Sequence, residues 1–239
     1  DGAALSLPVH GVGGDCTDFL ALSPRRSALL LADVAGHGVP AALIAAHLQA
    51  SWRSDFALAG GALPGRLQRL NADLLSRVAP GHYATLFAGE YDGRNGRLSY
   101  ANCGHVSPVV LRADGGTTVL ESTTTILGVF AAWECPLAEI ALGPGDLLLA
   151  CTDGVTEAQD GAGQAFGTGR WLAAAREARH LALPALLGAI AAAVQRFTGG
   201  TPQDDLTLIA ARPRRPVELQ PLRGRASQTP FLAREGSAP

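Results

Sequence analysis

The sequence predicts an α+β fold in which antiparallel strands and paired helices form separate layers. Two observations support this class: the expected strands come in runs joined by tight turns, and the expected helices follow one another in pairs instead of alternating with strands. Chain length bears on the number of domains, because 239 residues, 47% of them hydrophobic, suffice for one domain with a sizeable core. We therefore expect a single layered domain over residues 1–212.

The N-terminal part is expected to contain three strands and then two helices. The glycine-rich stretch 11–14 separates the first two strands, and an uninterrupted apolar run indicates that the third is buried. Pro40, a residue favoured in the first helical turn, marks the start of the first helix. The strands are expected at Leu5–Val9, Phe19–Leu22 and Ala28–Val34, and the helices at Ala41–Trp52 and Leu63–Val78.

The rest of the domain, from residue 83 to residue 211, is expected to form six strands, then two helices and a last strand. Asp-Gly and Asn-Gly dipeptides between the first strands are typical of hairpin turns. The strands are expected at Tyr83–Tyr91, Gly96–Asn102, Pro108–Arg112, Thr117–Leu120, Leu137–Leu142, Asp146–Cys151 and Leu206–Ala211, and the helices at Gly169–Ala178 and Leu183–Phe197. From Pro213 onward, arginines mix with five prolines and few large apolar residues, which predicts a disordered tail over 213–239.

Composition excludes several functions. The formal net charge of −2 gives no nucleic-acid signature, and the sequence holds no apolar run of the ~20 residues that a membrane span needs. All nineteen basic residues are arginine, so neither Schiff-base chemistry nor a P-loop lysine is available. The chain contains no methionine, and we expect it to be a fragment of a longer protein.

The four cysteines are scattered and form no Cys-x-x-Cys pair, which argues against a zinc knuckle or a redox dithiol of that kind. They are expected to be buried, reduced thiols, and the expected compartment is the cytoplasm.

Acidic residues mark four places where an expected strand or a tight turn begins or ends. They are Asp15, Asp33, Asp153 and the pair Asp204-Asp205. Each alone is explained by an ordinary turn or cap. Together they are harder to dismiss, because neighbouring strand ends meet at one rim of a sheet and clustered carboxylates repel one another. A hard divalent cation relieves that repulsion, and all-oxygen ligands favour Mg²⁺ or Mn²⁺ over zinc.

These residues lie within motifs that resemble a known family. The segments GVGGDCTDF, LLLADVAGHGVPAAL, NCGH, GDLLLACTDGVTEA and DDLTLIAA follow one another in the order and spacing of the metal-dependent serine/threonine phosphatases of the PPM type. The likeness is to the bacterial SpoIIE/RsbU branch and covers residues 11–212. It implies a four-layer αββα sandwich of two antiparallel sheets flanked by helices. It also implies hydrolysis of phosphoserine or phosphothreonine by a water that two Mn²⁺ or Mg²⁺ ions activate.

The resemblance also assigns roles to individual residues. Asp33 corresponds to the carboxylate that bridges both metals, with the Val34 carbonyl as a further ligand. Asp15 lies near the second metal, Asp153 and Asp204 are direct ligands, and Asp205 supports the site. For His37 two readings stay open: a general acid for the leaving serine, or a ring that only orients the loop. The implied partners are a phosphorylated STAS-type anti-sigma-factor antagonist and an upstream sensor or dimerisation domain that shifts the first helix pair.

Two alternatives remain at this point. A catalytically weak PPM-fold module would serve only in binding or signalling, although such a module is expected to lose metal carboxylates. A nucleotide cyclase would explain Gly-Gly-Asp at residues 13–15, but GGDCTDF lacks the Glu-Phe that follows in that signature. Retention of every matching carboxylate favours the phosphatase.

Overall fold

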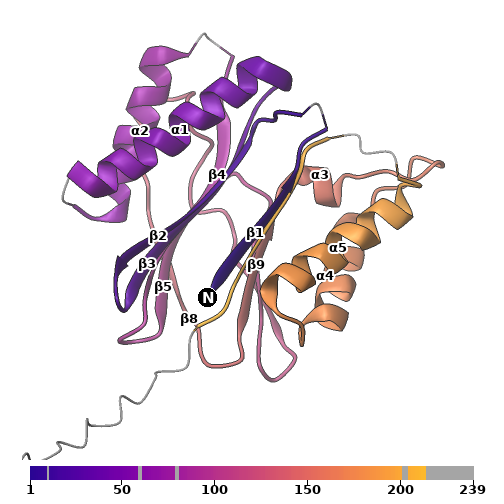
Figure 1. Ribbon diagram of the computed structural model, residues 1–239. Helices are drawn as coiled ribbons and strands as arrows, with labels where there is room; N and C mark the ends of the chain where they lie inside the picture. The colour runs from indigo at the N-terminus through magenta and orange to yellow at the C-terminus, as the bar shows by residue number, and fades with distance from the viewer. Residues whose placement is uncertain (10, 59–60, 79–80, 201–203, 214–239) are drawn as a thin grey trace, which may run out of the picture.

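Two five-stranded antiparallel sheets lie face to face in the computed structural model of the protein, and a pair of helices covers the outer face of each (Figure 1). The structure describes residues 1–9, 11–58, 61–78, 81–200 and 204–213. The expected four-layer αββα sandwich is confirmed. The tail expected from residue 213 lies outside the described residues, apart from Pro213 itself.

The first sheet joins the two ends of the domain. Its N-terminal strand pairs with the C-terminal one from Gly2↔Ala211 to Leu7↔Leu206. In order across the sheet its strands are β1 (Gly2–Leu7), β10 (Leu206–Ala211), β9 (Leu147–Cys151), β6 (Val109–Leu111) and β7 (Thr117–Val119). The second sheet is a meander that ends on a strand from later in the chain. Its order is β2 (Asp15–Ser23), β3 (Arg26–Val34), β4 (Ala84–Asp92), β5 (Arg97–Cys103) and β8 (Ala138–Ala141).

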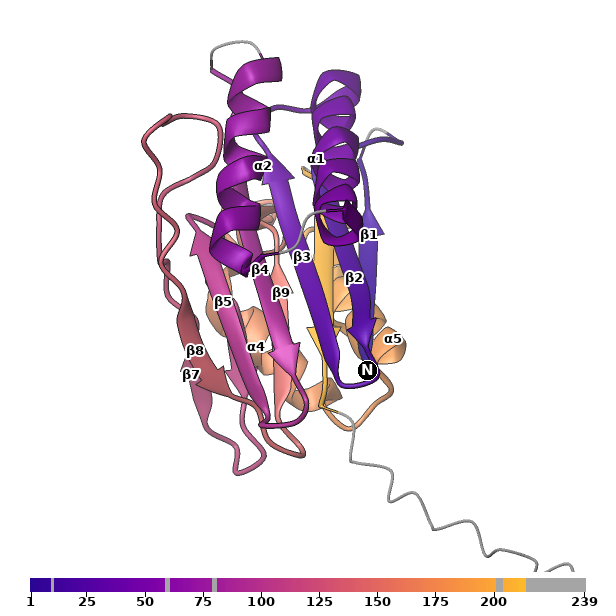
Figure 2. The same cartoon turned by 90° about the vertical axis from the view of Figure 1, so that its left-hand side faces the viewer.

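The helices are segregated by sheet. Helices α1 (Gly38–Leu58) and α2 (Leu63–Arg77) lie across the second sheet, whereas α4 (Gly167–Ala178) and α5 (Leu183–Phe197) cover the first on the opposite side (Figure 2). A single turn, α3 (Asp153–Thr156), follows β9 directly. Of the helices in the described part of the chain, none combines the length and the apolar character needed to cross a bilayer.

The alternation of side chains along β3 shows how the layers form. Leu30 and Ala32 pack in the core beneath α1 and α2, whereas Leu29 and Leu31 pack between the two sheets. Successive strand residues point to opposite faces, so both faces of this strand are buried. That explains why the sequence over this strand is an unbroken apolar run.

Strand β2 and helix α1 extend well beyond their expected ranges, and tertiary partners explain both extensions. Strand β2 begins at Asp15 because its polar first residues pair with β3 and because Arg53 of α1 donates two hydrogen bonds of 2.7 Å to the buried Asp18 carboxylate. Helix α1 extends beyond Trp52 over a polar stretch that contains Asp55, which pairs with Arg66 and Arg69 of α2. Neither partnership is visible from local sequence pattern.

Candidate active site

Two of the expected carboxylates face each other across neighbouring strands. Asp15 and Asp33 are directly paired in the β2–β3 register. By strand period Asp33 shares its face with Leu29 and Leu31, which pack between the sheets. Directly opposed residues have their Cβ atoms about 5 Å apart, and like charges there destabilise the pair. The fold therefore places two acids at the rim of the inter-sheet core.

The first sheet supplies the rest of the cluster. The Thr152 hydroxyl, just after β9, donates a 2.8 Å hydrogen bond to Asp15 of the second sheet, and so ties the two sheets together at this rim. Asp153 follows as the first residue of α3. Asp204 and Asp205 directly precede β10, the neighbour of β9, and the Asp205 N–H donates to the Asp204 carboxylate. All four acidic motifs thus converge on one edge of the sandwich.

Burial and neighbouring negative charge both raise the pKa values of acids in the cluster. Burial raises the pKa of Asp15 to about 8, although a hydrogen bond from Thr207 opposes the rise and the charge of Asp33 adds to it. Burial also raises the pKa of Asp33 to about 7, and the charges of Asp153, Asp204 and Asp205 contribute to that rise. The pKa of Asp153 is raised by the same combination of burial and neighbouring carboxylates. The fold holds acidic groups together at an electrostatic cost.

Asp205 has a different position within the cluster. One of its carboxylate oxygens accepts the Val9 N–H at 2.9 Å and the other accepts the Gly14 N–H at 3.1 Å. A Cβ on Gly13 would lie only 1.9 Å from this carboxylate, so the contact requires glycine there. Both oxygens thus bind the β1–β2 loop, which leads directly into Asp15. Asp205 therefore helps to position Asp15 within the cluster.

The loop after β3 carries Val34 and His37. The Val34 N–H donates to the Gly14 carbonyl at 3.2 Å, and the Val34 carbonyl oxygen lies 2.7 Å from where a Cβ on Gly14 would stand. Gly36 and Gly38 both adopt left-handed backbone with φ of 109° and 70°, which lets the chain turn sharply from β3 into α1. The His37 side chain is exposed between them, at the start of α1.

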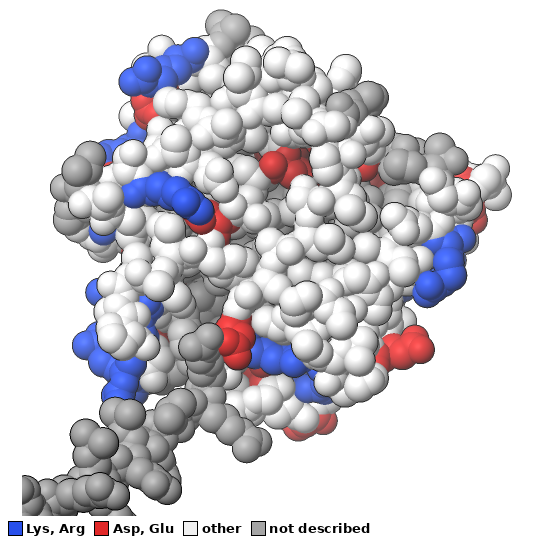
Figure 3. All heavy atoms as spheres, in the orientation of Figure 1, with Lys and Arg blue, Asp and Glu red and all other residues white. Residues whose placement is uncertain are grey.

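The donor chemistry of this cluster fits a hard divalent cation, because it offers carboxylate and carbonyl oxygens. Among the residues that the structure describes, no group of three or more His, Cys, Asp or Glu side chains is arranged so that it could hold a metal ion. A cation bound there would offset the charge of the neighbouring carboxylates, which adds to burial in raising the pKa values of Asp15, Asp33 and Asp153. In the view of Figure 3, acidic atoms reach the surface near the upper ends of β1 and β2 without a basic side chain beside them.

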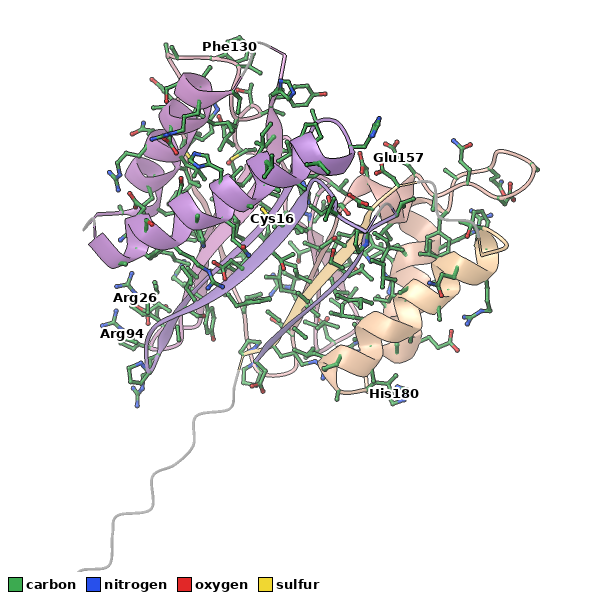
Figure 4. The ribbon with its side chains drawn as sticks, turned by 45° about the horizontal axis from the view of Figure 1, so that its top comes forward. Cys16, Arg26, Arg94, Phe130, Glu157 and His180 are labelled. Carbon is green, nitrogen blue, oxygen red and sulfur yellow. The ribbon has the colours of Figure 1, made fainter. Side chains whose placement is uncertain are left out.

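Other charged groups lie at the edges of this region or far from it. Glu157, just after α3, adds negative charge beside Asp153. It lies at the opposite end of the molecule from Arg26 and Arg94, which mark the hairpin ends of the second sheet (Figure 4). Those arginines pair with Glu90 and Asp92 respectively.

Sequence reasoning missed the threonines that support the cluster, whereas it had singled out His105 and favoured a role in fixing a loop. Thr152 bonds Asp15 and also accepts the Thr207 N–H at 3.1 Å. His105, of the NCGH segment, is buried with its Nδ1 atom 2.7 Å from the Thr85 hydroxyl, and Thr85 is the register partner of Asp33. Thr152 lies within a quoted acidic motif, and Thr85 lies opposite Asp33 on the neighbouring strand. The hydroxyl group of each bonds a residue that is distant in sequence.

Comparison with known proteins identifies relatives of this chain. The family model described as stage II sporulation protein E (SpoIIE) matches residues 23–214. Protein IcfG from Synechocystis sp. is 28% identical over 243 residues, which covers 87% of this chain and 37% of that protein. The phosphoserine phosphatase RsbU from Bacillus subtilis is 27% identical over 159 residues, covering 66% of this chain and 47% of RsbU. The chain therefore spans less than half the length of these two relatives.

Solved structures agree on the fold. The RsbU and RsbW domains of Rv1364c from Mycobacterium tuberculosis align with a TM-score of 0.78 at 28% identity, over 90% of this chain and 61% of that one. RsbX in complex with magnesium aligns with a TM-score of 0.63 at 16% identity, over 87% of this chain and 92% of that one. The second likeness concerns the fold alone.

Proposed function

Because the chain belongs to the SpoIIE family, the SpoIIE/RsbU group of the PPM-type phosphatases, we propose that it hydrolyses phosphoserine or phosphothreonine on a bacterial signalling protein. The observation that carries this proposal is the convergence of four acidic motifs from both sheets on one rim, where Asp15 and Asp33 face each other. PPM phosphatases are metal-dependent as a group, and the oxygen-rich cluster is consistent with that chemistry.

In this proposal the carboxylates divide into ligands and a positioning group. Asp33 would hold both ions, with Asp15, Asp153, Asp204 and the Val34 carbonyl as further ligands. Asp205 would act on the metals through Asp15, because its oxygens already accept hydrogen bonds from the β1–β2 loop. When bound, two Mn²⁺ or Mg²⁺ ions supply Lewis-acid polarisation of the phosphoryl group and a lower pKa for the attacking water.

His37 is the candidate for delivering a proton to the leaving group. A serine leaving as alkoxide needs a proton, and His37 is exposed on the loop that follows Asp33 and Val34. The alternative is that the ring only orients the loop between β3 and α1. The two roles differ in their dependence on the leaving group, so substrate comparison separates them.

The proposed partners follow from the resemblance to RsbU and its relatives. We place a STAS-type anti-sigma-factor antagonist as the phosphoprotein substrate, and an upstream sensor or dimerisation domain as the regulator. Helix α1 begins four residues after Val34, so a shift of α1 and α2 would move Asp33 and His37 relative to the first sheet. The cytoplasm, expected from the cysteine pattern, is part of the same proposal.

The experiment is a metal-dependent phosphatase assay. Purified protein is incubated with a phosphoserine protein and with p-nitrophenyl phosphate, in Mn²⁺, in Mg²⁺ and in EDTA. We expect turnover in either metal and its loss in EDTA, with restoration on adding metal back. Full activity in chelator would refute a metal phosphatase. Binding of the phosphoprotein without turnover in any metal would favour the catalytically weak module instead.

A further inference from the structure

Two of the four cysteines lie against each other in the core on the α1–α2 side of the second sheet. Cys103 ends β5 and is fully buried, and Cys135 is 5% exposed in the segment that leads to β8. Their side chains are hydrogen-bonded to each other. Sequence spacing gave no sign of this pair, because 31 residues separate the two positions.

The segment that carries Cys135 is fastened to the end of β5. Thr124 forms a bridge with Cys103, and its hydroxyl donates a 2.7 Å hydrogen bond to the Glu134 carbonyl, next to Cys135. The Trp133 indole N–H donates to the Thr125 carbonyl at 3.0 Å. These contacts hold the two thiols together independently of any bond between the sulfur atoms.

The two thiols are chemically unequal. The hydrogen bond from Cys103 lowers the pKa of the Cys135 thiol, although burial opposes this, whereas the same contact and burial hold the pKa of Cys103 well above its usual value. Thiolate is the reactive form of cysteine. Cys135 is also one layer below the surface, between the exposed residues Glu134 and Pro136.

We propose that Cys103 and Cys135 form an oxidisable dithiol that hydrogen peroxide converts to an intramolecular disulfide. The Cys135 sulfur attacks one peroxide oxygen, which breaks the O–O bond, forms a sulfenic acid and releases hydroxide. The Cys103 sulfur then attacks the Cys135 sulfur, and the sulfenic hydroxyl leaves with the Cys103 proton as water. Both thiol protons end in water, and two electrons pass from the sulfurs to the peroxide.

The geometry favours closure of this bond. An S–S bond of about 2.05 Å requires the sulfurs to approach more closely than hydrogen-bonded thiols do. Cys135 lies outside the sheets, so its segment can supply that movement while β5 stays paired with β4 and β8. The disulfide would staple the end of β5 to the segment before β8.

The other two cysteines provide matched internal controls. Burial raises the pKa of Cys16 to about 12, and the charges of Asp15 and Asp18 add to the rise. Burial likewise holds the pKa of Cys151 well above its usual value. Neither therefore has the thiolate character that attack on peroxide requires.

The test is oxidation of the folded full chain with hydrogen peroxide, followed by alkylation of free thiols, digestion and mass spectrometry. We expect the chain to lose the mass of two hydrogen atoms, a linked peptide pair containing Cys103 and Cys135, and reversal by dithiothreitol. Consumption of these two thiols should exceed that of Cys16 and Cys151 by about tenfold or more, since each pKa unit changes the thiolate fraction tenfold.

Variants distinguish the proposed sequence of steps. In Cys103→Ser, whose hydroxyl can still donate to the Cys135 sulfur, the Cys135 sulfenic acid has no thiol partner and should be trapped by dimedone, whereas Cys16→Ala should still form the disulfide. Equal alkylation of all four cysteines after peroxide would overturn the proposal. So would sulfinic acid at Cys135 with Cys103 still free. The mapping on the unaltered chain decides the matter even if a variant fails to fold.

Discussion

Replacing Gly154 with alanine tests whether tight packing of α3 against β10 holds the carboxylate cluster together. A Cβ at this position would lie 2.0 Å from the Asp205 carbonyl oxygen, whereas real Cβ contacts are essentially never under 3.0 Å. The atom that it meets is backbone, so no side-chain rotation relieves the overlap. Helix α3 and the start of β10 must separate by about 1 Å, which moves Asp153 away from Asp204.

The expected effect is on both stability and turnover. Overpacking of this kind costs about 1–3 kcal/mol, which lowers Tm by about 2–12 °C in a domain of this size. A displacement of about 1 Å among catalytic groups lowers turnover by about 100-fold. Thermal unfolding followed by circular dichroism and kcat/KM on a phosphoserine protein across a Mn²⁺ titration measure the two effects.

The matched control is Gly188→Ala in α5. This glycine is exposed in the helix interior, with nothing within 4 Å of an added Cβ. Alanine is the better helix former, so this variant should be more stable by about 0.5–1 kcal/mol and fully active. If Gly154→Ala matched the wild type in Tm and in Mn²⁺ dependence, close α3–β10 packing would not hold the cluster together.

Three further changes probe the site and the fold. Asp33→Asn should lower kcat/KM by on the order of 100-fold or more, because a neutral amide cannot offset the charge of two cations. Glu177→Gln on the exposed face of α4 is the control. Near-normal turnover by Asp33→Asn in saturating Mn²⁺ would contradict the role of Asp33. His37→Ala should reduce turnover of phosphoserine more than that of p-nitrophenyl phosphate, whose leaving group needs no proton; equal losses would favour loop orientation. The third change concerns Asp146, where burial opposes ionisation but hydrogen bonds from two backbone N–H groups and Arg112 keep the pKa below its ordinary value of 3.8. A lowered folded-state pKa stabilises the fold above pH 3.8 and ceases to do so as the pH falls through the folded value. The stability deficit of Asp146→Asn, measured by urea unfolding, should therefore shrink in acid, and a deficit independent of pH would contradict this.

The local sequence pattern was sufficient to predict the elements that bury an apolar face. The run over β3 and the turn signals of the hairpins predicted their strands, because these depend on neighbouring residues in sequence. Asp15 through Asp18 in β2 read as polar and were not expected to be a strand. Their stability comes from pairing with β3 and from Arg53, both distant in sequence.

The candidate site shows the same division. The grouping of its carboxylates could be predicted, because four acidic motifs stand where expected strands or turns begin or end. Thr152 and the place of Asp205 could not be predicted, since each is defined by a hydrogen bond between segments that only the β1–β10–β9 pairing brings together. The Cys103–Cys135 contact likewise depends on how the segment before β8 folds back on β5.

The pairing of β1 with β10 has a mechanical consequence. The Asp1 backbone nitrogen donates to the Arg212 carbonyl, and the Arg212 N–H donates back to the Asp1 carbonyl, so both ends of the sandwich leave it at one point. Tension applied between these ends acts on the paired residues of β1 and β10 one pair at a time, beginning at Gly2↔Ala211 and reaching Leu7↔Leu206 last. Under force the two strands therefore separate one residue pair after another, and the last pair, Leu7↔Leu206, lies beside Asp204 and Asp205.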